Sequence, residues 1–420
     1  MIKILHFADA HIDIAAQGRH DPLSGLPVRM LDFLKSLDTI VDTAISEKVD
    51  LVIFAGDAYK DRTPVPTYQR EWGKRIIRLS QAGIPTLLLV GNHDVSPAAN
   101  RANTLQEYDT LQVPHVIVAN KPMLLKPVDL DGLPLQIIAL PWVSRSGLLA
   151  MQENIELSAE KINATLEGKL DDLVQAWVEE LDPSIPAVLT AHGSVAGATY
   201  GAERSVMLGN DIILPGSMVR NPVFSYTALG HIHKAQDINE GHQPPVIYPG
   251  SIERVDFGEI ADEKFFVIAE VELGKPTTVA WHKLNGRKFI DRYVKVQDAE
   301  LAMSQILSAL PSQQEMEDAM LRLVLEYPRE WASMIDESEI RRVCQKTLEL
   351  HLIPRPVMEH RLRLPGDQSI NSMSHMDLLE IYWKSIHLDG EELDTMKKIA
   401  GEVIREEEME LDLEDRVQEP

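Results

Sequence analysis

The 420-residue sequence has little cysteine and no long apolar run. Its one thiol, Cys344, cannot form a disulfide within the chain, and this scarcity is typical of proteins in a reducing cytoplasm. The absence of any run of about eighteen apolar residues excludes an obvious membrane-spanning helix. Because the N-terminus enters an apolar segment without a basic region before it, we expect a cytoplasmic protein without a secretion signal.

Basic residues are also in the minority. The chain has 41 Lys and Arg against 65 Asp and Glu, which gives a formal net charge of −24. A protein that coats nucleic acid non-specifically depends on Lys and Arg that neutralise phosphates, so the charge argues against that class. Many carboxylates lie near the C-terminus, in residues 402–414, and bound divalent cations reverse the local sign of charge. The composition therefore remains compatible with a metal-dependent phosphodiesterase.

Five apolar segments end in residues that can bind metal ions or phosphate. The clearest is 86–90, which is bounded by proline and glycine and is followed by Asn92, His93 and Asp94. A short, continuous apolar run of this kind is typical of a strand buried on both faces. Segments of the same form occur at 2–7, 51–55, 187–191 and 226–229. Ligands bind beyond the carboxyl ends of strands in open α/β sheets, so we expect the functional site there.

The segment ends together provide carboxylate, imidazole and amide donors. The candidate metal ligands are Asp9, His11, Asp57, Asn92, His192, His231 and His233. Carboxylates with imidazoles and without thiolates favour Mn²⁺, Fe²⁺ or Zn²⁺ over a structural zinc site. Seven ligands are too many for one ion but suit two ions about 3.5–4 Å apart, which clamp a phosphate during in-line displacement.

Two of these residues have expected catalytic roles. Asp57 stands alone at its strand end and is the natural bridge between the two ions. His93 lies next to the ligand Asn92 but on the other side of the chain, so it is the candidate proton donor to the leaving oxygen. Asp94 is expected to orient His93 or the turn at Asn92. His6 lies within the first segment and is interpreted as an ordinary structural histidine.

In chain order these motifs resemble those of the calcineurin-like metallophosphoesterases. They are Asp9-x-His11, Gly56-Asp57, Gly91-Asn92-His93-Asp94, His192 and Gly230-His231-x-His233, and they span residues 1–260. Segments 56–60, 67–69 and 248–254 make the chain similar to the SbcD family of nuclease subunits within that superfamily. The resemblance implies an α/β fold, a four-layer sandwich of mixed sheets flanked by helices.

The resemblance also implies an activity and a division of the ligands. The implied protein is a Mn²⁺-dependent nuclease of DNA double-strand-break repair, a 3′–5′ exonuclease on duplex and an endonuclease on single strands. One ion is implied on Asp9, His11, Asp57 and His233, and the other on Asp57, Asn92, His192 and His231, with His93 as the catalytic histidine. Where the family often has a second histidine, this chain has Lys60, which can pair with a phosphate. Arg19 and His20 are weaker candidates for substrate binding.

The pattern of predicted strands and helices changes near residue 285. We expect a nuclease domain at 1–285, an α+β capping domain at 286–365 and a helical tail at 366–420. Within the capping domain, strands are predicted at 288–296, 319–327 and 351–364, with helices at 298–310 and 336–350. The tail contains two amphipathic segments, 378–386 and 393–404. They either pack on their own domain or bind a partner, which the resemblance implies is a coiled-coil, SMC-like ATPase of the SbcC type.

Other functions remain open at this point. The motifs alone also suit a free-standing phosphoesterase that acts on small phosphodiesters or nucleotides, because one fold and one metal site host many substrates. A third possibility is a DNA-end-binding scaffold protein, against which the intact ligand set argues. The capping domain and the tail favour the nuclease.

The resemblance further implies a homodimer formed through the first two helices.

Overall fold

The computed structural model describes residues 1–13, 18–96, 101–142, 159–201, 213–357 and 374–385, with shorter pieces at 388, 390, 393–401 and 403. Contacts divide the chain into two compact units. One comprises Met1–Arg292, Pro311–Leu323 and Arg341–His351, and the other comprises Tyr293–Leu310, Val324–Ile340 and Leu352–Pro420. Among the described residues, no helix has the length and apolar character needed to cross a membrane.

The first sheet has six strands in the order β14-β13-β1-β2-β3-β4. Its strands are β1 (Ile2–Phe7), β2 (Leu51–Phe54), β3 (Thr86–Leu89), β4 (Val116–Ala119), β13 (Lys264–Val271) and β14 (Thr278–Leu284). Strands β1 to β4 are parallel, as the alternation of apolar segments with helices predicts, whereas β13 and β14 join antiparallel. The edge strand β14 is largely exposed, so it lacks the continuous apolar run that marks the other strands.

The second sheet also has six strands, in the order β11-β12-β10-β7-β6-β5. Its strands are β5 (Met123–Leu125), β6 (Gln136–Leu140), β7 (Ala187–His192), β10 (Tyr226–Gly230), β11 (Gln236–Asp237) and β12 (Val246–Tyr248). The four central strands are parallel and the two edge strands are antiparallel. Both sheets are therefore mixed, and each contains a block of four adjacent parallel strands.

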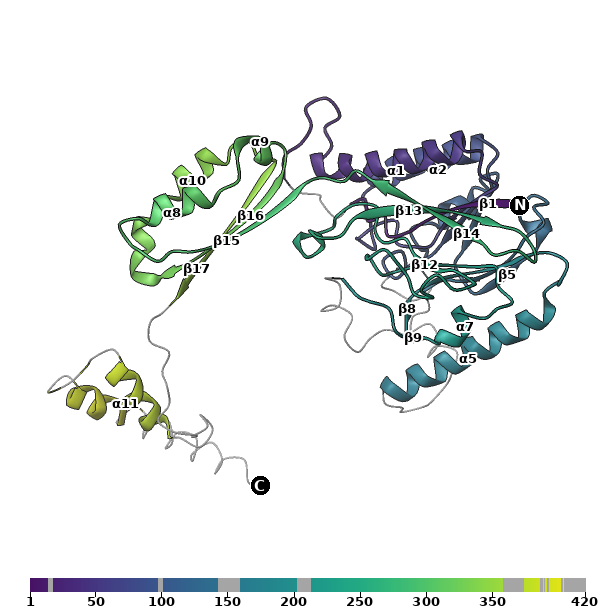
Figure 1. Cartoon of the computed structure of the whole chain (residues 1–420). Coiled ribbons are helices and arrows are strands. Elements are labelled where there is room, and N and C mark those ends of the chain that lie inside the picture. The colour runs from purple at the N-terminus through teal and green to yellow at the C-terminus, as the bar shows by residue number, and fades with distance from the viewer. Residues whose placement is uncertain are drawn as a thin grey trace, which may run out of the picture. The chain divides into compact units, whose positions relative to one another are not determined.

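The sheets stack between two layers of helices (Figure 1), which makes the expected four-layer sandwich. Helices α1 (Val28–Ser46) and α2 (Pro66–Gln81) cover the first sheet, and α5 (Ala159–Glu180) and α7 (Gly216–Val219) lie against the second. Alternation along β1 shows why both faces are apolar. Leu5 and Phe7 pack against the helices, whereas Ile4 packs between the sheets.

The C-terminal part of the chain has a three-stranded sheet in the order β15-β16-β17. Its elements are β15 (Phe289–Lys295), α8 (Ala302–Ala309), α9 (Gln313–Met316), β16 (Met320–Pro328), α10 (Glu337–Val343) and β17 (Glu349–Val357). The predicted helix 336–350 was too long. Its end is fixed because Thr347 donates to the carbonyl of Cys344 from both its backbone and its hydroxyl, which turns the chain into β17.

The tail begins with α11 (His375–Ser385). Ser374 and Asp377 cap it reciprocally, since Asp377 N donates to Ser374 Oγ and Ser374 N donates to the Asp377 carboxylate, each at 3.2 Å. Residues 393–401 are also helical, in agreement with the second predicted segment. Residues 358–364 of the predicted third strand lie outside the described part of the chain.

Candidate metal centre

Parallel strands of both sheets end at the candidate metal centre. Asp9 and His11 follow β1, Asp57 follows β2, Asn92 and His93 follow β3, His192 ends β7, and His231 and His233 follow β10. The loops are joined by backbone hydrogen bonds, such as Asp9 N to Gly56 O at 2.9 Å and Ala10 N to Asp57 O at 2.8 Å. Predicted ligands from the ends of five strands are thus brought together.

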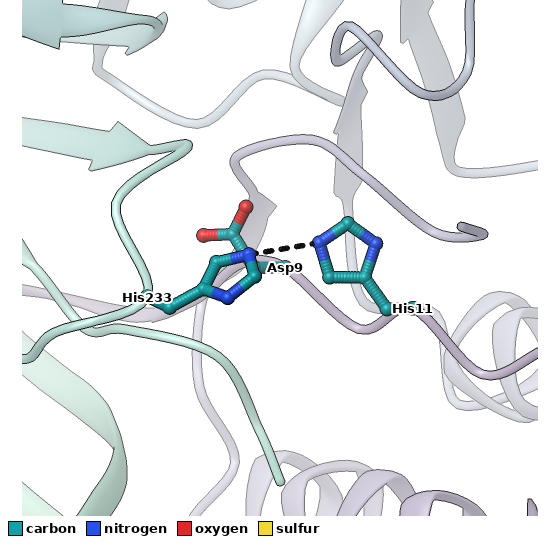
Figure 2. A group of neighbouring side chains, drawn as sticks. All are labelled: Asp9, His11 and His233. Carbon is teal, nitrogen blue, oxygen red and sulfur yellow. Dashed lines mark hydrogen bonds between the residues drawn. The ribbon is translucent and has the colours of Figure 1, made fainter. Parts of the chain in front are cut away.

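Six of the seven predicted ligands form two compact, buried groups. One group is Asp9, His11 and His233, and the other is Asp57, His192 and His231; within each group, one donor atom per residue lies within 4.8 Å of the others. Figure 2 shows the first group, with His11 and His233 facing each other from different loops. Their Nε2 atoms are 3.1 Å apart.

Asp57 connects these groups, and Asn92 joins the second of them. Oδ2 of Asp57 lies 3.7 Å from Nε2 of His11 in the first group and 3.4 Å from Nε2 of His192 in the second. Oδ1 of Asn92, the seventh predicted ligand, lies 3.0 Å from His192 Nε2 and 3.0 Å from His231 Nδ1. The carboxylate of Asp57 is therefore the one that faces both groups, as a bridging ligand must.

The hydrogen bonds made by the Nδ1 atoms of His11 and His233 show whether the Nε2 atoms of these residues can bind a cation. His11 Nδ1 lies 3.2 Å from the carbonyl of Tyr59, and His233 Nδ1 lies 2.7 Å from the Glu259 carboxylate, so both Nδ1 atoms are donors. In the neutral tautomers, both Nε2 atoms then present lone pairs to each other. Such a contact is repulsive unless a proton or a metal ion binds to the lone pairs. The residues present therefore fit a bound cation.

The pKa values of the buried groups also indicate that the site suits a cation. Burial favours the neutral form of Asp9 and raises the pKa of its carboxyl to about 7. Burial acts on Asp57 in the same sense, but His192 and the other imidazoles hold the pKa of this carboxyl well below its usual value. Burial opposes a charge on His192, yet the Asp57 carboxylate raises the pKa of this imidazole to about 9. Metal ions bind the deprotonated forms of such groups, so protons and a metal ion compete for the same atoms.

Several of these residues have unusual backbone conformations. φ is +51° at Asp9, +39° at His11, +66° at Asp57 and +99° at His231. Non-glycine residues with positive φ are uncommon and store strain, which is typical of functional sites held by their surroundings. Packing is also tight, because a Cβ atom at Gly230 would lie 2.0 Å from the carbonyl oxygen of Ala55. Close contacts with neighbouring segments therefore set the conformation of these loops.

Asp94 stabilises the loops that follow β2 and β3 through hydrogen bonds to their backbone. The fully buried carboxylate accepts hydrogen bonds from Asp57 N at 2.8 Å, Ala58 N at 3.1 Å and Gly91 N at 2.9 Å. It also accepts one from the Thr104 hydroxyl at 3.0 Å. The sequence predicted that Asp94 orients His93 or the Asn92 turn; the structure shows that it ties the loop after β3 to the loop after β2.

His93 lies beside both groups, since its ring centre is 5.2 Å from that of His11 and its backbone contacts Asp57. Its backbone N–H donates to Asp57 Oδ1 at 2.8 Å, and its Nδ1 lies 2.8 Å from the carbonyl of Lys60. The Nζ of the same lysine lies 3.3 Å from His93 Nε2. Asp13, which the sequence analysis did not single out, accepts the backbone N–H groups of Lys60 and Asp61 and fixes this loop.

The structure also shows the positions of Arg19, His20 and His6, which the sequence analysis named, and of Trp142, which it did not. Arg19 and His20 are exposed, and His20 Nδ1 bonds to the carbonyl of Gly18, outside both donor groups. His6 is buried and bonds to the Tyr226 hydroxyl and the Leu229 carbonyl, which is a structural role. Trp142, whose ring centre lies 5.1 Å from that of His231, was missed because no motif marks it.

Comparison with known proteins agrees with this geometry. Residues 2–235, just over half of the chain, match the model of the calcineurin-like phosphoesterase family. The chain is 25% identical over 409 residues to SbcD, the D component of nuclease SbcCD, from Escherichia coli K12, with 94% of each chain covered, and equally similar to SbcD of the O157:H7 strain. A dimetal phosphatase from Danio rerio aligns over 67% of this chain and 96% of its own, at 11% identity and a TM-score of 0.40. The chain belongs to the calcineurin-like phosphoesterase family of metal-dependent hydrolases.

Proposed function

We propose that this protein is a Mn²⁺-dependent nuclease that hydrolyses phosphodiesters in DNA, as a 3′–5′ exonuclease on duplex and an endonuclease on single strands. The observation that carries the proposal is the pair of buried donor groups with Asp57 facing both. The choice of DNA is supported by the similarity to SbcD of nuclease SbcCD, which extends over 94% of both chains and so beyond the family match at 2–235.

In this proposal seven residues hold two ions. Asp9, His11, His233 and Asp57 hold one, and Asp57, Asn92, His192 and His231 hold the other. When bound, such ions supply a nucleophilic hydroxide at neutral pH and neutralise the charge that develops on the phosphate. Asp57 keeps the two groups together, while the strained loops and Asp94 keep the donors in place without reorganisation.

His93 is the proposed proton donor to the leaving oxygen. With Nδ1 bonded to the Lys60 carbonyl, Nε2 of His93, which has the Lys60 ammonium 3.3 Å away, is the ring nitrogen left to exchange a proton. Burial and the nearby Lys60 ammonium both lower the pKa of His93, although the Asp57 carboxylate opposes them. A phosphate at the centre adds negative charge beside the imidazole and restores its proton affinity. Lys60 is the proposed phosphate-binding residue, because its exposed ammonium lies next to His93.

The partners are also part of the proposal. Large apolar side chains are exposed in the tail, among them Tyr382, Met396, Ile399 and Val403. Exposed apolar positions at helical spacing are typical of helices that dock into a groove on another protein. We therefore assign the tail to binding an SbcC-type coiled-coil ATPase. A homodimer formed through α1 and α2, and a contact of Arg19 and His20 with substrate, remain predictions from the sequence.

One experiment separates the proposal from its nearest alternative. The purified chain is incubated with labelled duplex DNA, single-stranded DNA or a small chromogenic phosphodiester, first with Mn²⁺ and then with EDTA. Degradation of both DNAs that depends on Mn²⁺ is the expected result. Turnover of the small ester with both DNAs intact would instead identify a free-standing phosphoesterase.

A further inference from the structure

Behind the first donor group lies a buried ion pair that the proposed reaction does not use. Glu259 and Lys264 are 2% and 1% exposed, and Glu259 Oε2 lies 2.7 Å from Lys264 Nζ. An ion pair taken out of water costs free energy, so that its presence alone is weak evidence for a role in stability. The question is what the pair holds in place.

Both members of the pair contact His233. Glu259 Oε1 accepts the Nδ1–H of this imidazole at 2.7 Å, and Lys264 Nζ donates to the backbone carbonyl of His233 at 3.3 Å. The lysine also donates to Ser251 Oγ at 2.7 Å, so that its three N–H groups have three acceptors. The backbone and the side chain of one predicted ligand are therefore both fixed from the same buried pair.

Glu259 is itself anchored on every side. Its Oε2 accepts the backbone N–H of Val255 at 2.9 Å in addition to Lys264, and the Ser251 hydroxyl lies 3.5 Å away. Its own carbonyl accepts from Arg254 Nε at 3.3 Å. The hydrogen bond from His233 and the charge of Lys264 both stabilise the ionised carboxylate.

His233 differs in this respect from His11 and His192. The Nδ1 atoms of His11 and His192 bond to backbone carbonyls, those of Tyr59 and Ala55, whereas that of His233 bonds to a carboxylate. A carboxylate behind a ligating histidine fixes its tautomer and orientation and makes its other nitrogen more basic. That other nitrogen, Nε2 of His233, is the atom that faces His11 in Figure 2.

We propose that Glu259 is a positioning residue that, by accepting the Nδ1–H of His233, fixes the tautomer and orientation of this imidazole and thereby the affinity of the Asp9–His11–His233 group for its ion. Lys264 balances the charge of the carboxylate and holds the His233 backbone. The proposal rests on the metal centre proposed above, and it concerns metal binding rather than the substrate.

The test uses two double variants in which the buried lysine is removed. Glu259→Leu with Lys264→Met removes both charges and preserves apolar volume, a change that buried ion pairs often tolerate, but leaves Nδ1 of His233 without its acceptor. Glu259→Gln with Lys264→Met removes the same charges but restores an amide oxygen that can accept from Nδ1. Glu263→Gln, at an exposed glutamate that pairs with Lys283, is the surface control.

Mn²⁺ binding to the full chain is measured by titration calorimetry, and electron paramagnetic resonance distinguishes a coupled ion pair from an isolated ion. The Leu/Met variant is expected to bind one of its two ions about 10–100-fold more weakly and to lose the coupled signal, with the Gln/Met variant recovering most of the affinity. The Glu263→Gln control is expected to match the wild type.

Two results would overturn the proposal while leaving the metal centre intact. If both double variants bound two ions like the wild type, Glu259 would serve only as the counter-ion of Lys264. If both were weakened equally, the hydrogen bond to Nδ1 would be irrelevant. A wild-type chain that bound no Mn²⁺ would instead remove the metal centre, and the proposal with it. None of these readouts depends on hydrolysis of DNA.

Discussion

At the scale of single residues, the candidate centre is defined by which atoms face each other. Asp57 Oδ2 lies within 3.7 Å of one imidazole in each donor group, while Asp57 Oδ1 accepts the backbone N–H of His93. One carboxylate thus connects both ion-binding groups with the proposed proton donor. Substitutions at Asp57 and His93 should therefore have different consequences, although the two residues are in contact.

We expect Asp57→Ala to lose both ions and with them all phosphodiesterase activity, because neither group keeps the ligand that they share. Asp57→Asn keeps an acceptor for His93 N–H and tolerates the positive φ, so it separates loss of charge from local distortion. Metal content is measured by elemental analysis or by anomalous scattering. Two ions held in the Asp57→Ala protein would show that this residue is not the bridge.

His93→Asn is expected to retain both ions and to lower kcat by about 10²–10⁴-fold, the range for removal of a general acid. The reason is that His93 contacts Asp57 through its backbone N–H, which the substitution preserves. His115→Asn is the matched control, because His115 is a surface histidine paired with Asp131. A His93→Asn protein with unchanged turnover would exclude the imidazole from proton transfer.

Mn²⁺ binding should release protons at neutral pH. With a pKa of about 9, His192 is protonated at pH 7 in the metal-free protein, and Asp9, with a pKa of about 7, is partly so. Metal ions bind the deprotonated forms, so the apparent affinity should rise as pH increases from 6 to 9. Calorimetry in buffers of different ionisation enthalpy counts the protons, and about one or more is expected at pH 7. Heats that do not depend on the buffer would contradict this assignment.

At the scale of elements, the strands deliver the ligands but the loops between them hold the geometry. Asp94 shows how. One carboxylate, fully buried, accepts three backbone N–H groups from the loops that follow β2 and β3. These loops contain Asp57 and Asn92, and so the relative position of two predicted ligands depends on a residue that ligates neither ion.

Asp94→Ala is expected to lower the free energy of unfolding by roughly 3–5 kcal/mol, because three buried N–H groups lose their acceptor. Chemical denaturation of the metal-free protein measures the change without a contribution from bound ions. Asp109→Ala, at an exposed position of α3 (Gln106–Thr110), should change stability by no more than about 0.5 kcal/mol. Equal effects at the two positions would mean that Asp94 is not the anchor described above.

The elements also show where sequence patterns suffice. The ligand-bearing strands are buried on both faces, so their apolar runs and the polar residues at their ends were visible in sequence. β14 escaped prediction because its side chains are mostly exposed, and the helix at 336–350 was predicted too long because the turn at Cys344 and Thr347 has no glycine or proline to mark it. Glu259 and Asp13 were missed because their roles arise from contacts between distant segments.

At the scale of the whole molecule, the family match covers residues 2–235, whereas the similarity to SbcD of nuclease SbcCD covers nearly the entire chain. The residues beyond the metal centre are therefore the part of the chain in which the proposed nuclease and its alternative, a free-standing phosphoesterase, are expected to differ. Within the tail, Met396, Ile399 and Val403 are about half exposed and occur at helical spacing i, i+3 and i+7. When a partner covers apolar side chains of this kind, the free energy falls because apolar area is removed from water.

Deletion of residues 376–420 is expected to leave metal-dependent hydrolysis by the chain unchanged and to abolish binding to an SbcC-type ATPase. The donor residues all precede position 234, so the deletion removes none of them. A full-length chain with Met396, Ile399 and Val403 replaced by serine tests the same surface without truncation, and Lys398→Ser is its matched control. Co-purification with the ATPase is the measurement. If both the truncated and the serine-substituted proteins still co-purified, the tail would not be the docking element; if hydrolysis were lost together with binding, the tail would support the catalytic unit rather than the partner.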